Sequence, residues 1–410
     1  MLVTANLQIR LVGRVATVPK ETKLKRILIC VSAVVMLVIT IGLNQRPQQS
    51  HAALPPQGNE TSADVDADAG SSSKVALVPE GQPTYVGRDV CRECHQENYD
   101  LHGQHGHAHT FAMASEPEVM SKFVGREFDY GDPYGRFIYE QDDDGLVARL
   151  ADEESDPFRL EYALGSGHNA FTLLSLEPDD EKGTVACEHR ASWFRSGDRL
   201  GRTPGQPLLE PESELEKFGM KHSDNVMQKC IYCHVTTGVV KDQQIVGLTA
   251  NVNCEKCHGP ASEHVRQARA MKNPPPFSVG ESNWDSESEI HLCGDCHRLP
   301  EAISQKELRD YPRTLARFQP VGLLRSECFI QSNGKLRCTT CHNPHKTNRE
   351  ETEAEHVSNC IQCHQVETES HVSCPVSKTE GCIDCHMPKY EFESLGTGFH
   401  DHWIRVHPED

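Results

Sequence analysis

The pentapeptide C-x-x-C-H occurs seven times in this chain of 410 residues, six times between Cys230 and His386 and once far upstream. In this spacing two thiols can add to the vinyl groups of one porphyrin, and the adjacent histidine can bind its iron, as in c-type haem attachment. We therefore expect seven covalent haems c. The expected attachment residues are Cys91, Cys94, Cys230, Cys233, Cys254, Cys257, Cys293, Cys296, Cys338, Cys341, Cys360, Cys363, Cys382 and Cys385. The expected proximal iron ligands are His95, His234, His258, His297, His342, His364 and His386.

Structural zinc is the other common use of paired cysteines. A zinc site usually joins two such pairs and does not require a histidine directly after the second cysteine. All seven pairs in this chain carry that histidine. The pattern therefore favours haem over zinc.

The chain has few apolar residues for a conventional core, with 37% hydrophobic and 6% aromatic residues. Porphyrins are large apolar plates, and seven of them would supply the missing core. The sequence thus predicts a multihaem cytochrome c fold, mainly short helices and loops wrapped around covalent haems. Low hydrophobicity is also typical of disordered chains, but the ordered pattern of cysteines and histidines argues against disorder.

Six basic residues precede a 17-residue apolar run at positions 27–43. Residues 1–43 therefore have the layout of a signal peptide or of an uncleaved signal anchor. Either one predicts export, to the periplasm or another extracytoplasmic compartment, and the second predicts attachment to the inner membrane through residues 27–43. Residues 44–83 are rich in Pro, Gln, Ala, Ser, Asp and Gly, which predicts a flexible linker.

The formal charge is -19. This charge disfavours binding to nucleic acid and favours redox partner proteins that are basic or neutral. The sequence leaves the oligomeric state open.

An oxidising compartment permits disulfides, and Cys328 and Cys374 are the candidate pair because both lie in the haem-rich half. Cys187 has no evident partner.

Three regions follow the linker. Residues 84–121 hold the first motif and an expected helix with a cluster of four histidines, His102, His105, His107 and His109. Residues 122–205 contain no motif, and their strand-like alternation between Gly, Pro and Asp turns predicts a small antiparallel β insert. Its His168 follows a Gly-rich turn and is either an iron ligand or an ordinary histidine at a strand end. Residues 206–410 form a six-haem region whose motif spacing is too irregular for a solenoid.

The second axial ligands must come from outside the motifs. Sixteen further histidines are available, against only eight methionines, so we expect mostly bis-His ligation and low potentials. His264 and His345 each follow a motif histidine closely, and the local turn prevents either from binding the same iron. Each is therefore predicted to serve a neighbouring haem.

From Tyr85 onward the chain resembles multihaem c-type cytochromes related to the tetrahaem cytochrome that accepts electrons from hydroxylamine oxidoreductase. The segments that carry the resemblance are YVGRDVCRECH with GHAHTF, CEKCHGPASEH and CTTCHNPH. CIDCHMPK followed by FHDHWIRV is similar to the closing segment of pentahaem nitrite reductases and octahaem hydroxylamine oxidoreductases. The resemblance implies second ligands at His107, His264, His345, His371 and His402, with His400 as the alternate to His402.

These patterns predict an electron-transfer protein. The alternative is a multihaem oxidoreductase that acts on a small nitrogen or sulfur compound at one five-coordinate haem. The C-x-x-C-K motif typical of pentahaem nitrite reductases is absent from the sequence. No catalytic residue can be assigned, and the first haem, beside the histidine cluster and the β insert, is the candidate site for such chemistry.

Overall fold

The computed structural model describes residues 82–151, 153, 156–274, 277, 279, 284–364 and 374–407. The expected export segment, the linker up to residue 81 and His371 lie outside the described residues. Among the residues it describes, no helix is both long and apolar enough to span a membrane.

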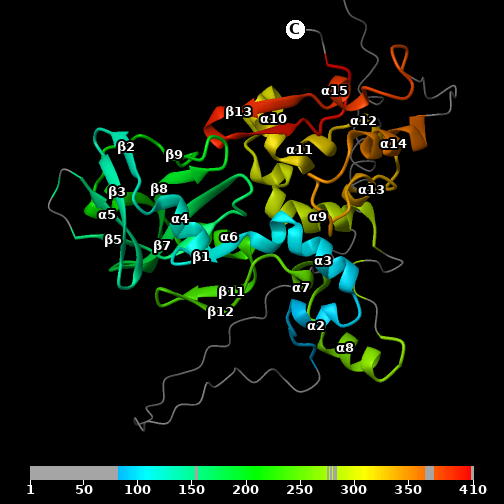
Figure 1. Ribbon diagram of the computed structural model, residues 1–410. Helices are drawn as coiled ribbons and strands as arrows, with labels where there is room; N and C mark the ends of the chain where they lie inside the picture. Colours follow the sequence, from blue (N-terminus) through cyan, green and yellow to red (C-terminus); the bar gives the residue numbers. More distant parts are fainter. Residues whose placement is uncertain are drawn as a thin grey trace, which may run out of the picture. The chain divides into compact units, whose positions relative to one another are not determined.

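Two antiparallel sheets form the expected β insert (Figure 1). One sheet has the order β2-β3-β4-β5, and the other has the order β1-β6-β7-β8-β10 with β9 paired to β8. The insert is larger than predicted, because β1 and β10 lie outside residues 122–205. The strands are β1 (Phe111–Met113), β2 (Glu127–Gly131), β3 (Gly135–Asp142), β4 (Gly145–Leu150), β5 (Phe158–Leu160), β6 (Tyr162–Leu164), β7 (Ala170–Asp179), β8 (Gly183–Phe194), β9 (Arg199–Arg202) and β10 (Gly219–His222).

The sheets enclose a conventional hydrophobic core. Phe137 and Tyr139 of β3 pack with Leu173 of β7, and all three side chains are fully buried. Each such side chain contributes roughly 1.5–3 kcal/mol when it leaves water. The Tyr139 hydroxyl and His189 Nε2 share a hydrogen bond of 2.7 Å inside this core, and burial lowers the pKa of His189 to about 3. His189 is therefore a neutral core residue. The insert thus has a hydrophobic core that does not require a porphyrin.

Outside the insert the chain consists mainly of short helices and loops, as predicted (Figure 1). Each C-x-x-C segment is in a helix or runs on directly from one. One helical turn brings residues i and i+3 to the same face, so both cysteines of a motif can reach one porphyrin. The motif helices are α2 (Arg88–Arg92), α6 (Asp224–His234), α7 (Cys254–His258), α9 (Ser286–His297), α13 (Cys338–Cys341), α14 (Glu353–His364) and α15 (Cys382–His386).

The remaining elements connect these helices. They are α3 (Gln96–Gln104), η1 (Gly106–His109), α4 (Pro117–Phe123), α5 (Glu214–Phe218), α8 (Ser262–Arg269), η2 (Pro300–Ala302), α10 (Gln305–Asp310), η3 (Arg313–Arg317), α11 (Gln319–Leu323), α12 (Glu327–Gln331) and η4 (Glu393–Leu395). Two hairpins, β11 (Val235–Lys241) with β12 (Gln244–Ala250) and β13 (Lys389–Phe392) with β14 (Thr397–His400), were not predicted in the six-haem region. In the first hairpin, Asp242 and Gln243 adopt positive φ angles of 50° and 57°, which suit a two-residue turn.

The disulfide expected between Cys328 and Cys374 is not formed. Neither cysteine is in a disulfide. Cys328 lies near the motif cysteines Cys341 and Cys360, which feel its charge. Cys187 is buried on β8, and burial raises the pKa of its thiol. Cys187 therefore behaves as a small apolar core residue.

Candidate haem centres

Four motif histidines lie close to a second imidazole. When two imidazoles share one haem iron, their ring centroids lie roughly 6 Å apart, because each Fe–N bond is about 2 Å long. Each of the four pairs has this spacing and joins a motif histidine to one outside the motifs. The pairs and their centroid distances are His95–His264 at 6.3 Å, His258–His345 at 6.1 Å, His297–His107 at 6.1 Å and His342–His402 at 6.3 Å.

Two of these pairs join different motifs through a short step in sequence. His264 lies on α8 just after His258, yet its ring lies beside His95. His345 follows His342 by three residues, yet its ring stacks on His258 with an interplanar angle of 3°. Both side chains therefore lie where only the iron of a neighbouring motif could use them.

Hydrogen bonds orient the imidazoles of two further motif histidines, His234 and His386. Nδ1 of His234 donates to the carbonyl of Thr110 (2.9 Å), and Nδ1 of His386 donates to the carbonyl of Arg405 (3.0 Å). A carbonyl oxygen can only accept, so the proton of each neutral imidazole is on Nδ1. Nε2 is then free for a metal, and the bond to Nδ1 fixes the plane of the ring. These residues therefore fit a haem iron.

Several of the paired histidines, from inside and outside the motifs, are also held in the state that binds a metal. Burial lowers the pKa of His402 to about 4 and that of His107 to about 3. Burial lowers the pKa of His258, His297 and His345 as well. A neutral imidazole is the form that coordinates iron, so no proton has to leave these side chains near pH 7.

The structure distinguishes the four histidines of the first cluster. Nδ1 of His105 accepts the backbone N–H of His107 (3.0 Å), so its Nε2 carries the proton. Nε2 of His109 donates to the carbonyl of Gly103 (2.8 Å). The ring of His102 stacks on that of His105 at 6.2 Å. Only His107 of this cluster lies beside a motif histidine at the spacing of two shared ligands.

The other expected ligands are placed differently. The ring of His168 lies 6.0 Å from that of His109 rather than beside a motif histidine. Nδ1 of His400 donates to the carbonyl of Met387 (2.8 Å), and His402 is the one that lies beside His342. In the part of the chain that the structure describes, no second imidazole lies at this spacing from His234 or His386.

The first motif is not isolated in space. Glu255, inside the motif CEKCH, is only 3% exposed, and its carboxylate accepts the backbone N–H groups of Val86 (2.9 Å), Gly87 (2.8 Å) and Ala261 (3.0 Å). These contacts hold the first motif against the third. Sequence reasoning missed Glu255, because the two middle positions of a motif carry no signal of their own.

The other motif helices also contact one another. The Tyr232 hydroxyl on α6 donates to Asp295 on α9 (3.3 Å), and Glu289 on α9 accepts the backbone N–H of Thr339 on α13 (2.7 Å). Contacts between α13 and α14 and between α14 and α15 continue the series. The side chains of Cys257 and Cys293 lie near one another, which places α7 near α9. The motif helices therefore follow the order α2, α7, α9, α13, α14 and α15, with α6 beside α9.

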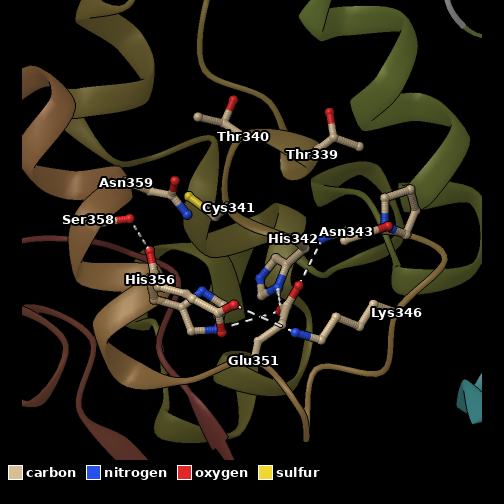
Figure 2. Close-up of a pocket in the computed structure, with 12 residues that line it drawn as sticks. Thr339, Thr340, Cys341, His342, Asn343, Lys346, Glu351, His356, Ser358 and Asn359 are labelled. Atoms are coloured by element: carbon tan, nitrogen blue, oxygen red, sulfur yellow. Dashed lines mark hydrogen bonds and ion pairs between the residues drawn. The ribbon is translucent and has the colours of Figure 1, made fainter. Parts of the chain in front are cut away.

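A cavity of about 550 Å³ lies beside the motif at Cys341. Figure 2 shows His342, Glu351 and His356 turned toward one another at this cavity. Glu351 Oε2 lies 3.1 Å from His342 Nδ1 and 3.5 Å from His356 Nε2. Burial acts to raise the pKa of Glu351, but the bonds from the Asn343 N–H and His342 outweigh it and lower this pKa. Glu351 therefore carries a carboxylate against the proximal histidine. No signal in the sequence marks it.

Gly322 on α11 lets the C-terminal segment approach closely. A Cβ at this position would lie 2.5 Å from Trp403 N and 2.7 Å from His402 C. Both are backbone atoms, so the segment that carries His402 would have to move. We expect Gly322→Ala to lower the free energy of unfolding by about 1–3 kcal/mol. Thermal unfolding of the purified protein checks this value, and an unchanged midpoint would show that the segment adapts.

Two segments match known families. Residues 208–259 match the family model "Cytochrome c554 and c-prime", and residues 332–369 match the model "Doubled CXXCH motif". No curated protein sequence is similar enough to match the chain. Both matched segments contain C-x-x-C-H motifs, so these matches show two segments of the kind that c-type cytochromes use to bind haem c. The predicted resemblance to multihaem c-type cytochromes is confirmed at this level.

Two solved structures match the chain at low identity. The outer cell wall cytochrome OcwA is 14% identical with a TM-score of 0.43, and the match covers 78% of this chain and 80% of OcwA. The undecaheme cytochrome from the S-layer of Carboxydothermus ferrireducens is 14% identical with a TM-score of 0.40, over 82% of this chain and 53% of that one. The chain thus spans about half the length of the second structure. None of these matches is a nitrite reductase or a hydroxylamine oxidoreductase.

Proposed function

We propose that this chain is an extracytoplasmic heptahaem c-type cytochrome that carries electrons between redox partner proteins through mostly bis-His haems. The four pairs of a motif and a non-motif histidine carry this proposal. An iron held between two imidazoles has no open position for a substrate. Such a centre suits electron transfer better than catalysis.

The packing of the motif helices supports a connected route. When bound, the haems supply the redox step, because their iron changes between the ferric and ferrous states. The residues of the chain hold neighbouring motifs together and orient the imidazoles. Glu255 and Glu289, for example, each fix one motif helix against another segment that carries a motif. We infer a route that follows the order of the motif helices, with a branch where α6 meets α9.

The surroundings of the protein follow from its charge and its N-terminal segment. A net charge of -19 favours basic or neutral electron donors and acceptors over nucleic acid. Residues 27–43 would direct export and, if retained, would attach the protein to the inner membrane. Residues 44–83 would then connect that attachment to the haem-bearing part.

One set of measurements on the exported protein tests the function. We expect its mass and its pyridine haemochrome spectrum to give seven haems. We also expect a mainly low-spin ferric spectrum that nitrite, hydroxylamine and carbon monoxide leave unchanged. Fewer haems, or a spectrum without low-spin haem, would contradict the proposal.

The same spectrum tests the oxidoreductase alternative. A substantial high-spin fraction that binds nitrite or hydroxylamine would support a catalytic haem. His264 lies at the spacing of a second ligand from His95. The haem attached at Cys91 and Cys94 is therefore no longer the preferred candidate for a five-coordinate catalytic site. The irons at His234 and His386 are better candidates, since no second imidazole in the described residues lies at the spacing of two shared ligands from either histidine. Their spin state decides between the two functions.

A further inference from the structure

We propose that Glu351 lowers the reduction potential of one haem, the one attached at Cys338 and Cys341, by accepting the Nδ1 proton of His342 with a buried carboxylate. This inference rests on the proposed binding of the haem iron by His342. It adds a residue that tunes one site and thereby distinguishes that site from the others.

The loop between α13 and α14 places Glu351 against His342 and largely removes it from water. Its side chain is 8% exposed. One carboxylate oxygen accepts His342 Nδ1 at 3.1 Å, and the other accepts the backbone N–H of Asn343 at 2.9 Å. Figure 2 shows both bonds. Because both oxygens are held, the carboxylate keeps its orientation toward the imidazole.

The other oriented proximal histidines lack such a partner. Nδ1 of His234 and of His386 donates to a backbone carbonyl, at 2.9 Å and 3.0 Å. A charged acceptor forms a hydrogen bond roughly twice as strong as a neutral one. It draws the Nδ1 proton away from the ring, so Nε2 becomes a more basic ligand. A more basic ligand stabilises the ferric state over the ferrous state, which lowers the potential.

Nothing in the described structure neutralises this carboxylate with a fixed cation. Lys346 pairs with Glu355 at 3.6 Å, and no Lys or Arg among the described residues forms an ion pair with Glu351. The second neighbour of Glu351 is His356, whose Nε2 lies 3.5 Å away. His356 contacts the carboxylate that holds Nδ1 of His342, so it lies on the side of the ring away from the proposed iron.

His342, Glu351 and His356 could instead hold a divalent metal ion, since their ligand atoms lie within 4.8 Å of one another. That use would require His342 to give up its Nδ1 proton while Nε2 binds iron. The haem motif therefore favours the role of Glu351 as an acceptor. Metal analysis of the purified protein separates the two roles.

The test compares Glu351→Gln with Glu355→Gln in spectropotentiometric titrations of the full chain with its haems. Glutamine keeps an acceptor for His342 but removes the charge. Glu355→Gln removes the same charge from an exposed residue four positions later, in the first turn of α14. We expect Glu351→Gln to raise the equilibrium constant for reduction of one haem about tenfold, or about 59 mV for a one-electron couple. We expect Glu355→Gln to leave all potentials unchanged.

Several results would overturn the inference. These are no shift in Glu351→Gln, an equal shift in Glu355→Gln, or one equivalent of zinc in the wild-type protein that Glu351→Gln loses. If Glu351→Gln loses a haem, Glu351→Asp serves in its place. This variant keeps the charge, so a change of less than tenfold in the equilibrium constant for reduction supports the proposal. A tenfold change contradicts it. Mass spectrometry of the CTTCH peptide separates a failure of the proposed function from a failure of the role proposed for Glu351. A wild-type peptide without haem refutes the proposed function itself, whereas a haem without a shift refutes only the role of Glu351.

Discussion

Replacing His345 with alanine is expected to convert one haem from a six-coordinate low-spin centre into a five-coordinate high-spin centre that binds carbon monoxide. The ring of His345 stacks on that of His258 at 6.1 Å, which is the spacing of two imidazoles on one iron. Alanine offers no donor atom, so the iron above His258 would lose its second ligand. Electron paramagnetic resonance and the carbon monoxide difference spectrum measure the change.

Two further variants make the His345 experiment specific. His345→Met keeps a donor atom and is expected to retain six-coordinate iron at a higher potential. His109→Ala removes a nearby histidine whose Nε2 is already bonded to the carbonyl of Gly103, so it should leave every haem low-spin. A spectrum of His345→Ala identical to that of the wild-type protein would refute the pairing of His345 with His258.

Replacing Glu255 with alanine is expected to detach the first motif from the third. The carboxylate accepts three backbone N–H groups, those of Val86, Gly87 and Ala261, in a site that is 3% exposed. A buried donor without a partner costs about 1–3 kcal/mol, so we expect a loss of roughly 3 kcal/mol or more in the free energy of unfolding. Thermal unfolding measures this loss. Limited proteolysis should also cut near residue 86 in the variant only.

A matched variant shows whether this effect comes from the contacts of Glu255 or from its charge. Glu263→Ala removes an acidic side chain from α8 that forms an exposed ion pair with Arg266. Exposed pairs of this kind contribute little, so we expect the Glu263 variant to unfold at nearly the wild-type temperature. Equal stabilities for the Glu255 and Glu263 variants would mean that Glu255 does not hold the first motif in place.

The sequence predicts the attachment residues of the haem sites but not how the second ligands pair with them. Attachment needs a fixed local spacing, which a linear pattern shows directly. Of the five second ligands that the resemblance implied, the structure places four beside motif histidines: His107, His264, His345 and His402. The fifth, His371, lies outside the described residues. Their partners could not be predicted from spacing, because His264 passes over the adjacent His258 and reaches His95. Only tertiary packing determines that choice.

The departures from expectation have similar causes. β10 is four residues long and has no clear alternation, yet β8 pairs with it along its whole length. Glu351 lies in an acidic stretch typical of a solvated surface, and its contact with His342 depends on the path of the loop. His168 was considered as a ligand because of its turn, and the structure places it beside His109. In each case a long-range contact outweighed the local pattern.

The pairing of motif and non-motif histidines has a consequence for biogenesis. On the proposed ligation, three irons receive their second imidazole from a part of the chain that is made and exported later: His264 for His95, His345 for His258 and His402 for His342. Only His297 finds its partner, His107, already across the membrane. Covalent attachment can therefore precede complete ligation, and the thioether bonds would hold each porphyrin until its later ligand arrives. A chain cut short before residue 402 would carry a haem at Cys338 and Cys341 that is attached but left with an open face.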